Sequence, residues 1–234
     1  MRILYIFPHP DDESFGPAPA MSKQRREGHE VYLLTLTKGG ATKQRHKYNY
    51  SVEEMGDVRY KEMLEVSKVL DLSGMNVLDL PDSGLKEMDP REIEKVIKEE
   101  IESIKPDVVV SYAVHGISGF HDHLVCHAVV KRVYAELKEN SPYLKRLALF
   151  TLSKEMAVSP GIFQLSFSTE DEIDCIIKVD EIDIENCMKA LDCYVTFKET
   201  IDASGVKSKI NSNVHFELYQ EEHKEKLKNL FEKL

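Results

Sequence analysis

The 234-residue chain has no tryptophan and only four cysteines, and no segment approaches the 18 consecutive apolar residues of a transmembrane helix. The cysteines, at positions 126, 175, 187 and 193, show no C-x-x-C spacing, which favours a reducing cytoplasm over a disulfide framework. The apolar run at residues 1–7 is too short for a signal peptide and has no small-residue cleavage site. We therefore expect a cytoplasmic protein that does not enter a membrane.

Positive charge is also scarce. The chain carries 31 Lys and Arg against 41 Asp and Glu, which gives a formal net charge of −10. A nucleic-acid-binding protein needs a basic face that replaces the counterions of the phosphates. The one dense basic stretch, residues 43–47, lies among polar residues and is typical of a solvated loop. The charge balance thus excludes nucleic acid as the expected partner.

Short apolar runs alternate with segments of helical periodicity over the first 150 residues. We expect strands at residues 2–7, 30–37, 76–80, 107–112 and 147–152, and helices at 17–27, 52–70, 90–104 and 122–139. This alternation predicts an α/β fold: a three-layer, Rossmann-like, mostly parallel sheet with helices on both faces. No linker or internal repeat divides the chain, so we expect one domain over residues 1–234.

The last third is less regular. The pattern there predicts a strand at 173–179, a helix at 182–197, a strand at 214–219 and a closing amphipathic helix at 221–234.

The first motif that carries chemistry is PHPDDE, residues 8–13, directly after the first strand. In open α/β sheets, ligands bind at the carboxyl ends of the strands, which is where this motif falls. The adjacent carboxylates of Asp11 and Asp12 need solvent or a partner beside His9. A metal ion resolves this, because histidine and aspartate are common zinc ligands and the remaining aspartate can act as a base. The alternative is an exposed acidic turn that caps the next helix.

A second motif, GISGFHDH at residues 116–123, follows the fourth expected strand at the same edge of the sheet. His9, Asp12 and His123 would supply two imidazoles and one carboxylate and leave a position open for water, as catalytic zinc sites do. Asp122 is placed to cap the next helix or to orient a ligand histidine. His127 falls on the apolar side of that helix, which favours a hydrogen-bonded core histidine over a fourth ligand.

Arg59 occupies an otherwise apolar stripe of the helix expected at 52–70. An inward guanidinium needs a carboxylate or a hydroxyl-rich or anionic ligand. The sequence leaves open whether Arg59 meets a substrate or forms a structural ion pair, with Glu62 or Asp82 as partner. Asp82 follows the third strand, so it is either a turn residue or a group within reach of the same cleft.

Taken together, these motifs resemble the LmbE-like, or PIG-L, family of zinc-dependent N-acetylglucosaminyl deacetylases. The resemblance covers roughly the first 150 residues. It rests on H-P-D-D-E at 9–13, E-G-H-E-V at 27–31, the loop with Thr37 and the glycine pair 39–40, R-x-x-E at 59–62, L-P-D-S-G at 80–84 and G-x-x-G-x-x-D-H at 116–123.

The resemblance implies roles for individual residues of this chain. His9, Asp12 and His123 would bind Zn²⁺, Asp11 would be the general base, and Arg59 and Asp82 would contact the sugar. It also implies a small-molecule amino-sugar conjugate as substrate. Members of the family are often oligomeric, so a homo-oligomer is compatible with it.

Two departures from the family pattern stand out. Where the family usually has H-P-D-H, this chain has F-H-D-H, so Phe120 replaces a histidine thought to help the oxyanion. We expect His121 to supply the missing catalytic contact, with His115 as the second candidate and Tyr112 and Tyr194 as more remote ones. Near the C-terminus, residues 190–197 (ALDCYVTF) keep the length of the family's A-x-x-H-x-S-Q-like pattern but not its His or Gln.

We therefore expect a zinc-dependent hydrolase that removes an N-acetyl group from an N-acetylglucosamine-type conjugate, with a metal-activated water and an aspartate base. One alternative is a metal-dependent amidase or phosphoesterase that acts on another substrate. A second is a non-catalytic, metal-containing carbohydrate-binding protein, although a base such as Asp11 beside the metal has no use in pure binding. A nucleotide-binding protein is disfavoured because no G-x-G-x-x-G follows the first strand.

Overall fold

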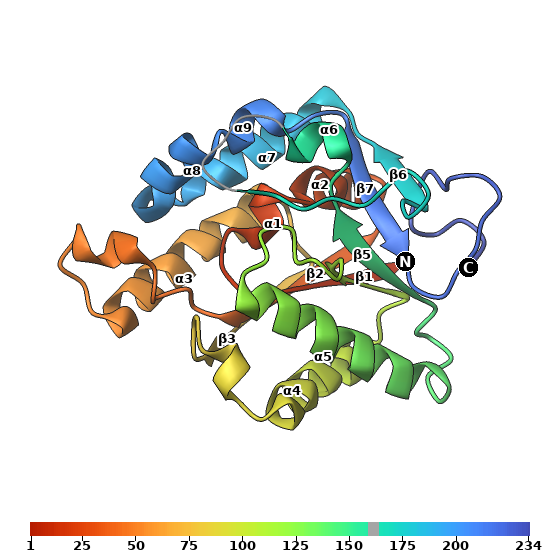
Figure 1. Cartoon of the computed structure of the whole chain (residues 1–234), viewed down its shortest axis with the longest axis horizontal. Coiled ribbons are helices and arrows are strands. Elements are labelled where there is room, and N and C mark those ends of the chain that lie inside the picture. Colours follow the sequence, from red (N-terminus) through yellow and green to blue (C-terminus); the bar gives the residue numbers. More distant parts are fainter. Residues whose placement is uncertain (159–163) are drawn as a thin grey trace.

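A seven-stranded sheet forms the middle layer of the protein (Figure 1), in a computed structural model that describes residues 1–158 and 164–234. Its strands are β1 (Arg2–Phe7), β2 (Glu30–Thr37), β3 (Gly74–Leu80), β4 (Val108–Tyr112), β5 (Arg146–Thr151), β6 (Cys175–Lys178) and β7 (Asn213–Leu218). Their order is β3-β2-β1-β4-β5-β7-β6. The first five strands are parallel, and β7 runs antiparallel to both β5 and β6. The predicted mostly parallel sheet is confirmed.

Successive side chains of a buried strand point to opposite faces of the sheet, so each strand supplies two hydrophobic cores. In β1, Ile3, Tyr5 and Phe7 join one core, and Leu4 and Ile6 join the other. Helices α2, α3 and α7 cover the first face, and α4 and α5 cover the second (Figure 1). The three-layer arrangement follows from these apolar runs, because each face needs a helical layer to exclude water.

The helices begin where the sequence supplies capping groups. In α3 (Val52–Val69), Ser51 and Glu54 form a capping box, and in α4 (Pro90–Ile104) the side chain of Asp89 accepts a hydrogen bond from the backbone N–H of Arg91. The other helices are α1 (Asp12–Phe15), α2 (Ala18–Arg26), α5 (His121–Lys138), α6 (Lys154–Ala157), α7 (Glu181–Cys193), α8 (Lys198–Ser204) and α9 (Val206–Lys209). Short 3-10 turns are η1 (Lys43–His46), η2 (Leu85–Glu87) and η3 (Val195–Phe197). None of the helices in the described residues is both long and apolar enough to span a bilayer.

The expected closing helix at 221–234 is wrong. This segment, all of it described, is irregular and packs along the sheet edge. The backbone N–H of Leu227 donates a hydrogen bond to the carbonyl oxygen of Asp174 (2.8 Å), and its carbonyl oxygen accepts one from the N–H of Ile176 (2.9 Å). Arg146 donates to the carbonyl of Leu230 at 2.8 Å. These tertiary hydrogen bonds, with the burial of Leu227 and Leu230, outweigh the amphipathic pattern of the segment.

Candidate active site

Segments from distant parts of the chain meet at the carboxyl edge of the parallel strands. Residues 8–13 follow β1, residues 113–120 join β4 to α5, Asp82 follows β3, and Arg59 comes from α3. All four line one cavity of about 280 Å³. The strand order changes direction between β1 and β4, and such switch points are where open α/β sheets bind ligands.

One nitrogen of His9, one nitrogen of His123 and both carboxylate oxygens of Asp12 lie close together. Nδ1 of His9 lies 3.3 Å from Nε2 of His123 and 3.5 Å from Oδ2 of Asp12, and Nε2 of His123 lies 3.3 Å from Oδ1 of Asp12. Tetrahedral bonds of 2.0–2.1 Å place neighbouring ligand atoms about 3.3 Å apart. The spacing of this cluster therefore fits a zinc-sized cation with its remaining coordination position open.

A hydrogen bond at the second ring nitrogen of each histidine orients its imidazole toward the cluster. Nε2 of His9 lies 3.1 Å from Oδ2 of Asp122, and Nδ1 of His123 lies 2.9 Å from the carbonyl oxygen of Gly116. Because these oxygens can only accept, the imidazoles donate from those nitrogens and leave the opposite ones free for a metal. Asp122 is itself fixed by the backbone N–H groups of Ser83 (2.8 Å) and Leu85 (3.3 Å). Asp122 thus fixes the ring of His9, and the N-cap of α5 is Phe120.

Negative charge dominates this part of the cavity. Asp82 approaches Nε2 of His9 at 3.3 Å and accepts a hydrogen bond from the backbone N–H of Ala41 at 2.6 Å. Burial disfavours the charged imidazole, but the hydrogen bonds to Asp12 and Asp122 outweigh it and raise the pKa of His9 to about 10. Burial alone would raise the pKa of Asp12, yet the neighbouring His123 holds it far below its usual range. The cluster stabilises positive charge, which a metal ion would supply.

Asp11 stands beside the cluster in a fixed, unusual conformation. Its φ of 83° lies in the left-handed region, and its carboxylate forms a short ion pair with the guanidinium of Arg59. Arg59 also donates to the carbonyl oxygens of Pro10 (2.9 Å) and Gly39 (3.0 Å). Burial, with the charges of Asp12 and Glu13, raises the pKa of Asp11 to about 7 although Arg59 lowers it. The inward arginine thus has a carboxylate partner, but it is neither Glu62 nor Asp82.

Gly39 makes the contact with Arg59 possible. Its φ is 65°, and a Cβ there would lie 2.4 Å from Nη1 of Arg59. Only glycine fits without moving the guanidinium. The loop after β2 is therefore part of what holds Arg59 against Asp11.

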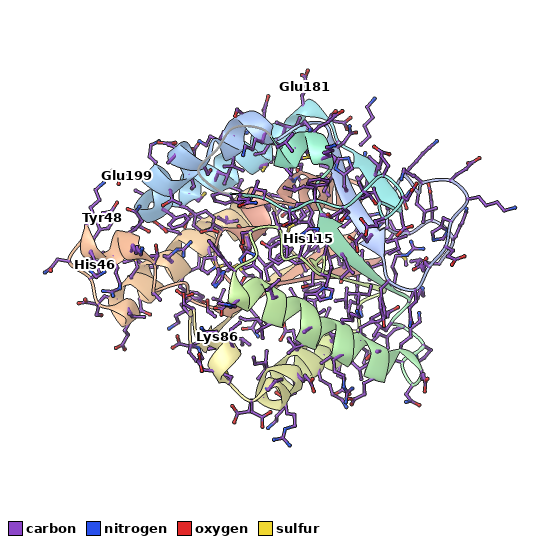
Figure 2. The ribbon with its side chains drawn as sticks, in the orientation of Figure 1. His46, Tyr48, Lys86, His115, Glu181 and Glu199 are labelled. Carbon is purple, nitrogen blue, oxygen red and sulfur yellow. The ribbon has the colours of Figure 1, made fainter. Side chains whose placement is uncertain are left out.

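The structure does not bring the expected substitute for the missing histidine to the cluster. Phe120 lines the cavity, but His121, the first residue of α5, is exposed and does not. His115, labelled near the centre of Figure 2, also lies outside the cavity lining. Its ring is engaged by the N–H of Ile117 (3.0 Å) and by Thr151 (3.3 Å). Their positions give no support for a role at the oxyanion.

Two aromatic neighbours and His127 behave as supporting groups. The ring of Tyr112 stacks on His123 with centroids 4.5 Å apart. His127 is buried and bonds through Nδ1 to the carbonyl oxygen of Tyr112 at 2.8 Å, so the expected core histidine is confirmed. The hydroxyl of Tyr194 donates a hydrogen bond to the carboxylate of Glu13 at 2.7 Å.

The C-terminal third contributes contacts that sequence reasoning missed. Thr196 donates to Glu62 through its N–H (2.7 Å) and its hydroxyl (2.9 Å). The guanidinium of Arg59 lies 4.6 Å from the ring centroid of Phe197. In the sequence, residues 190–197 are distinguished only by keeping the length of a family pattern. That preserved length was the one signal that pointed to these contacts.

Known proteins that are similar to this chain match the part of it that carries the polar residues of the cavity. Residues 4–134 match the family described as PIG-L: GlcNAc-PI de-N-acetylase. The chain is 29% identical over 144 residues to a probable N-acetyl-alpha-D-glucosaminyl L-malate deacetylase 2 of Bacillus subtilis, covering 60% of this chain and 64% of that protein. It is 30% identical over 142 residues to N-acetylglucosaminyl-phosphatidylinositol de-N-acetylase of Bos taurus, covering 58% of this chain and 52% of that one. The match thus spans between about half and two thirds of these relatives.

Among solved structures, the zinc-inhibited form of teicoplanin deacetylase Orf2 superposes with a TM-score of 0.74 at 13% identity. The superposition covers 93% of this chain and 97% of that structure. At this identity the likeness establishes the fold, and it extends through the C-terminal third that the family match leaves out.

Proposed function

Because this chain belongs to the PIG-L family, whose match covers more than half of its length, we propose that it hydrolyses the N-acetyl group of an N-acetylglucosamine-type conjugate. The observation that supports this most is the position of Asp11. A buried carboxylate lies directly beside three residues whose ligand atoms could hold a metal ion. That pairing of base and metal site suits hydrolysis of an amide.

The proposal assigns His9, Asp12 and His123 as the residues that hold a zinc ion. A zinc ion bound there would supply Lewis-acid chemistry, lowering the pKa of a water and polarising the acetyl carbonyl. Asp122 and the carbonyl of Gly116 keep the two imidazoles in the orientation that this binding needs.

Asp11 is the proposed proton carrier. Its carboxylate would accept the proton of the attacking water and return it to the amine nitrogen as the C–N bond breaks. Arg59 would hold that carboxylate in place, and its own hydrogen bonds to Pro10 and Gly39 leave little freedom for the pair to rotate. Asp82, which also lines the cavity, would contact the sugar hydroxyls.

A direct test incubates the purified protein with a panel of N-acetylglucosamine conjugates and measures acetate release, with phosphate release from phosphorylated sugars measured in parallel. We expect acetate from the conjugates, loss of activity on chelation, and recovery with added zinc. Phosphate release alone would favour a phosphoesterase. Binding of the conjugates without any turnover would favour a carbohydrate-binding protein.

A further inference from the structure

The cavity has two chemically different ends. The end at the carboxyl edge of β1 and β4 carries His9, Asp12 and the other polar groups described above. Beside the polar residues Ser204, Lys209, Asn211, Asn213 and His215, the last third of the chain lines the cavity with six apolar side chains, namely Met156, Leu165, Phe197, Val206, Ile210 and Val214. We call this set the apolar wall. It is continuous with the metal cluster because both line the same cavity.

The apolar wall lies outside the part of the chain that matches the family. The match ends at residue 134, and it contains every residue of the proposed metal site, Asp11, Arg59 and Asp82. The wall comes from α6, the segment before β6, η3, the α8–α9 pair and the start of β7. Helices α6, α8 and α9 lie in the upper part of Figure 1, beside the start of β7. This chain therefore builds the reaction end and the apolar wall from different parts of its sequence.

Several contacts hold the apolar wall against the reaction end. Figure 2 shows Glu199 of α8 near the segment that carries His46 and Tyr48, and Lys47 of that segment forms an ion pair with Glu199. Beside it, Gln44 donates to the hydroxyl of Thr200 at 3.1 Å. Phe197 belongs to the wall and also covers Arg59. Phe197 is therefore the direct contact between the wall and the reaction end, and α8 beside it is held to the loop after β2.

The chemistry of the wall defines what it can accept. The carboxylates of the cavity and the imidazoles of His9 and His123 lie at the reaction end, whereas the six side chains of the apolar wall offer no strong hydrogen-bonding group to an acetamido group or a sugar hydroxyl. Met156, Leu165, Phe197 and Ile210 pack on the hydrophobic core and are only partly buried by it, so their remaining surface faces the cavity. A strongly polar aglycone would lose its hydration there without gaining hydrogen bonds from these side chains.

We propose that the apolar wall is an aglycone subsite and that the substrate is an N-acetylglucosamine conjugate whose aglycone is an apolar alkyl or aryl group. This inference rests on the proposed deacetylase function and adds the substrate class to it. The sugar lies at the reaction end, and the aglycone lies along Leu165, Val206 and Ile210.

The test compares acetate release from N-acetylglucosaminides with methyl, butyl, hexyl and phenyl aglycones. Each methylene that the wall buries is expected to lower KM by up to about fourfold. We expect KM for the hexyl compound to be at least about tenfold below that for the methyl compound. The phenyl compound separates an aryl from an alkyl preference. Equal KM values across the series would overturn the subsite while leaving the deacetylase function intact.

Substitutions in the apolar wall test whether these residues cause the preference for the longer aglycone. Ile210→Asn should lower the hexyl-to-methyl ratio of kcat/KM at least about fivefold, and Leu165→Asn gives a second measurement if the first variant does not fold. Ile182→Asn is the matched control, because Ile182 is a partly exposed isoleucine of α7 that does not line the cavity. An unchanged ratio in both wall variants would contradict the proposal.

Calorimetry with hexyl and methyl glucosaminides, which carry no acetyl group, measures the wall independently of turnover. Tighter binding of the hexyl compound supports the apolar subsite even if no acetate is released from any compound, an outcome that would reject the deacetylase function alone. Equal affinity would reject the subsite.

Discussion

At the scale of single residues, the site depends on how each imidazole is held by its second nitrogen. His9 reaches the cluster through Nδ1 and His123 through Nε2, and a different oxygen fixes each ring. This predicts a graded response to mutation, because ligands and their outer partners contribute differently to metal affinity.

We expect His9→Ala, Asp12→Ala and His123→Ala each to lose most bound metal and most activity. The outer partner Asp122 is the matched comparison. Asp122→Asn should weaken metal binding by about 10–100-fold and retain metal at high concentration. Metal analysis after dialysis distinguishes the two groups. Full occupancy in all three alanine variants would reject the ligand assignment.

Asp11→Asn keeps the shape of the side chain and removes its ability to accept a proton. Metal content should stay at the wild-type level while kcat falls by about 10²–10⁴. The measurement is acetate release from a confirmed substrate beside metal analysis of the same sample. Turnover near that of the wild type would remove Asp11 from the mechanism.

His121→Ala tests the sequence-based assignment of an oxyanion contact. Since His121 is exposed and does not line the cavity, we now expect kcat of this variant to stay close to wild type. Loss of an oxyanion donor costs about 10²–10³ in kcat. A fall of that size in kcat of His121→Ala would support the assignment of His121 as an oxyanion donor.

At the scale of elements, the fold was predictable where the apolar pattern alone decides it. The expected α4 and β2 have the observed bounds, because a capped amphipathic stripe and a buried strand are local signals. The structure of the segment 221–234 was not predictable from its own sequence, because it depends on hydrogen bonds to Asp174 and Arg146, which lie far away in sequence. Within the site, the positions of His9, Asp12 and His123 after two neighbouring strands predicted that these residues meet, and they do. The pairing of Arg59 with Asp11 was not predictable, because it depends on the path of the loop through Gly39.

Arg146 is the residue that fixes this C-terminal segment to the sheet. It is fully buried in β5, pairs with both carboxylate oxygens of Glu221 (2.8 and 2.6 Å) and reaches Leu230. We expect Arg146→Ala to lower the free energy of unfolding by about 2–4 kcal/mol, as buried charge-assisted hydrogen bonds are lost. Urea denaturation measures this. Lys145→Ala, which removes a partly exposed ion pair with Asp107, is the control and should cost less than about 1 kcal/mol. Equal effects of the two variants would contradict the role of Arg146.

At the scale of the whole molecule, histidines whose pKa is lowered by full or partial burial couple stability to pH. Burial lowers the pKa of His115, His127 and His215 below the ordinary 6.5. As pH falls through 6.5, the unfolded chain takes up protons that the folded chain resists. The stability that these groups contribute is therefore present above pH 6.5 and is lost as the medium becomes more acid.

His127→Gln isolates one of these histidines. The difference in unfolding free energy between wild type and variant, measured on metal-free protein, should shrink between about pH 7.5 and pH 5.5, because only the wild type is destabilised by protonation at this position. A difference that stays constant or grows toward acid pH would contradict the assignment.

The hydrogen bond from Tyr194 to Glu13 joins residues that are 181 positions apart. During synthesis a chain that has emerged only as far as β5 already carries His9, Asp12 and His123, yet Glu13 still lacks the hydroxyl of Tyr194 and Arg59 the ring of Phe197. Ribosomes add about 5–20 residues each second, so several seconds separate the two stages. We therefore expect the contacts around Glu13 and Arg59 to be complete only after the last third of the chain has been synthesised.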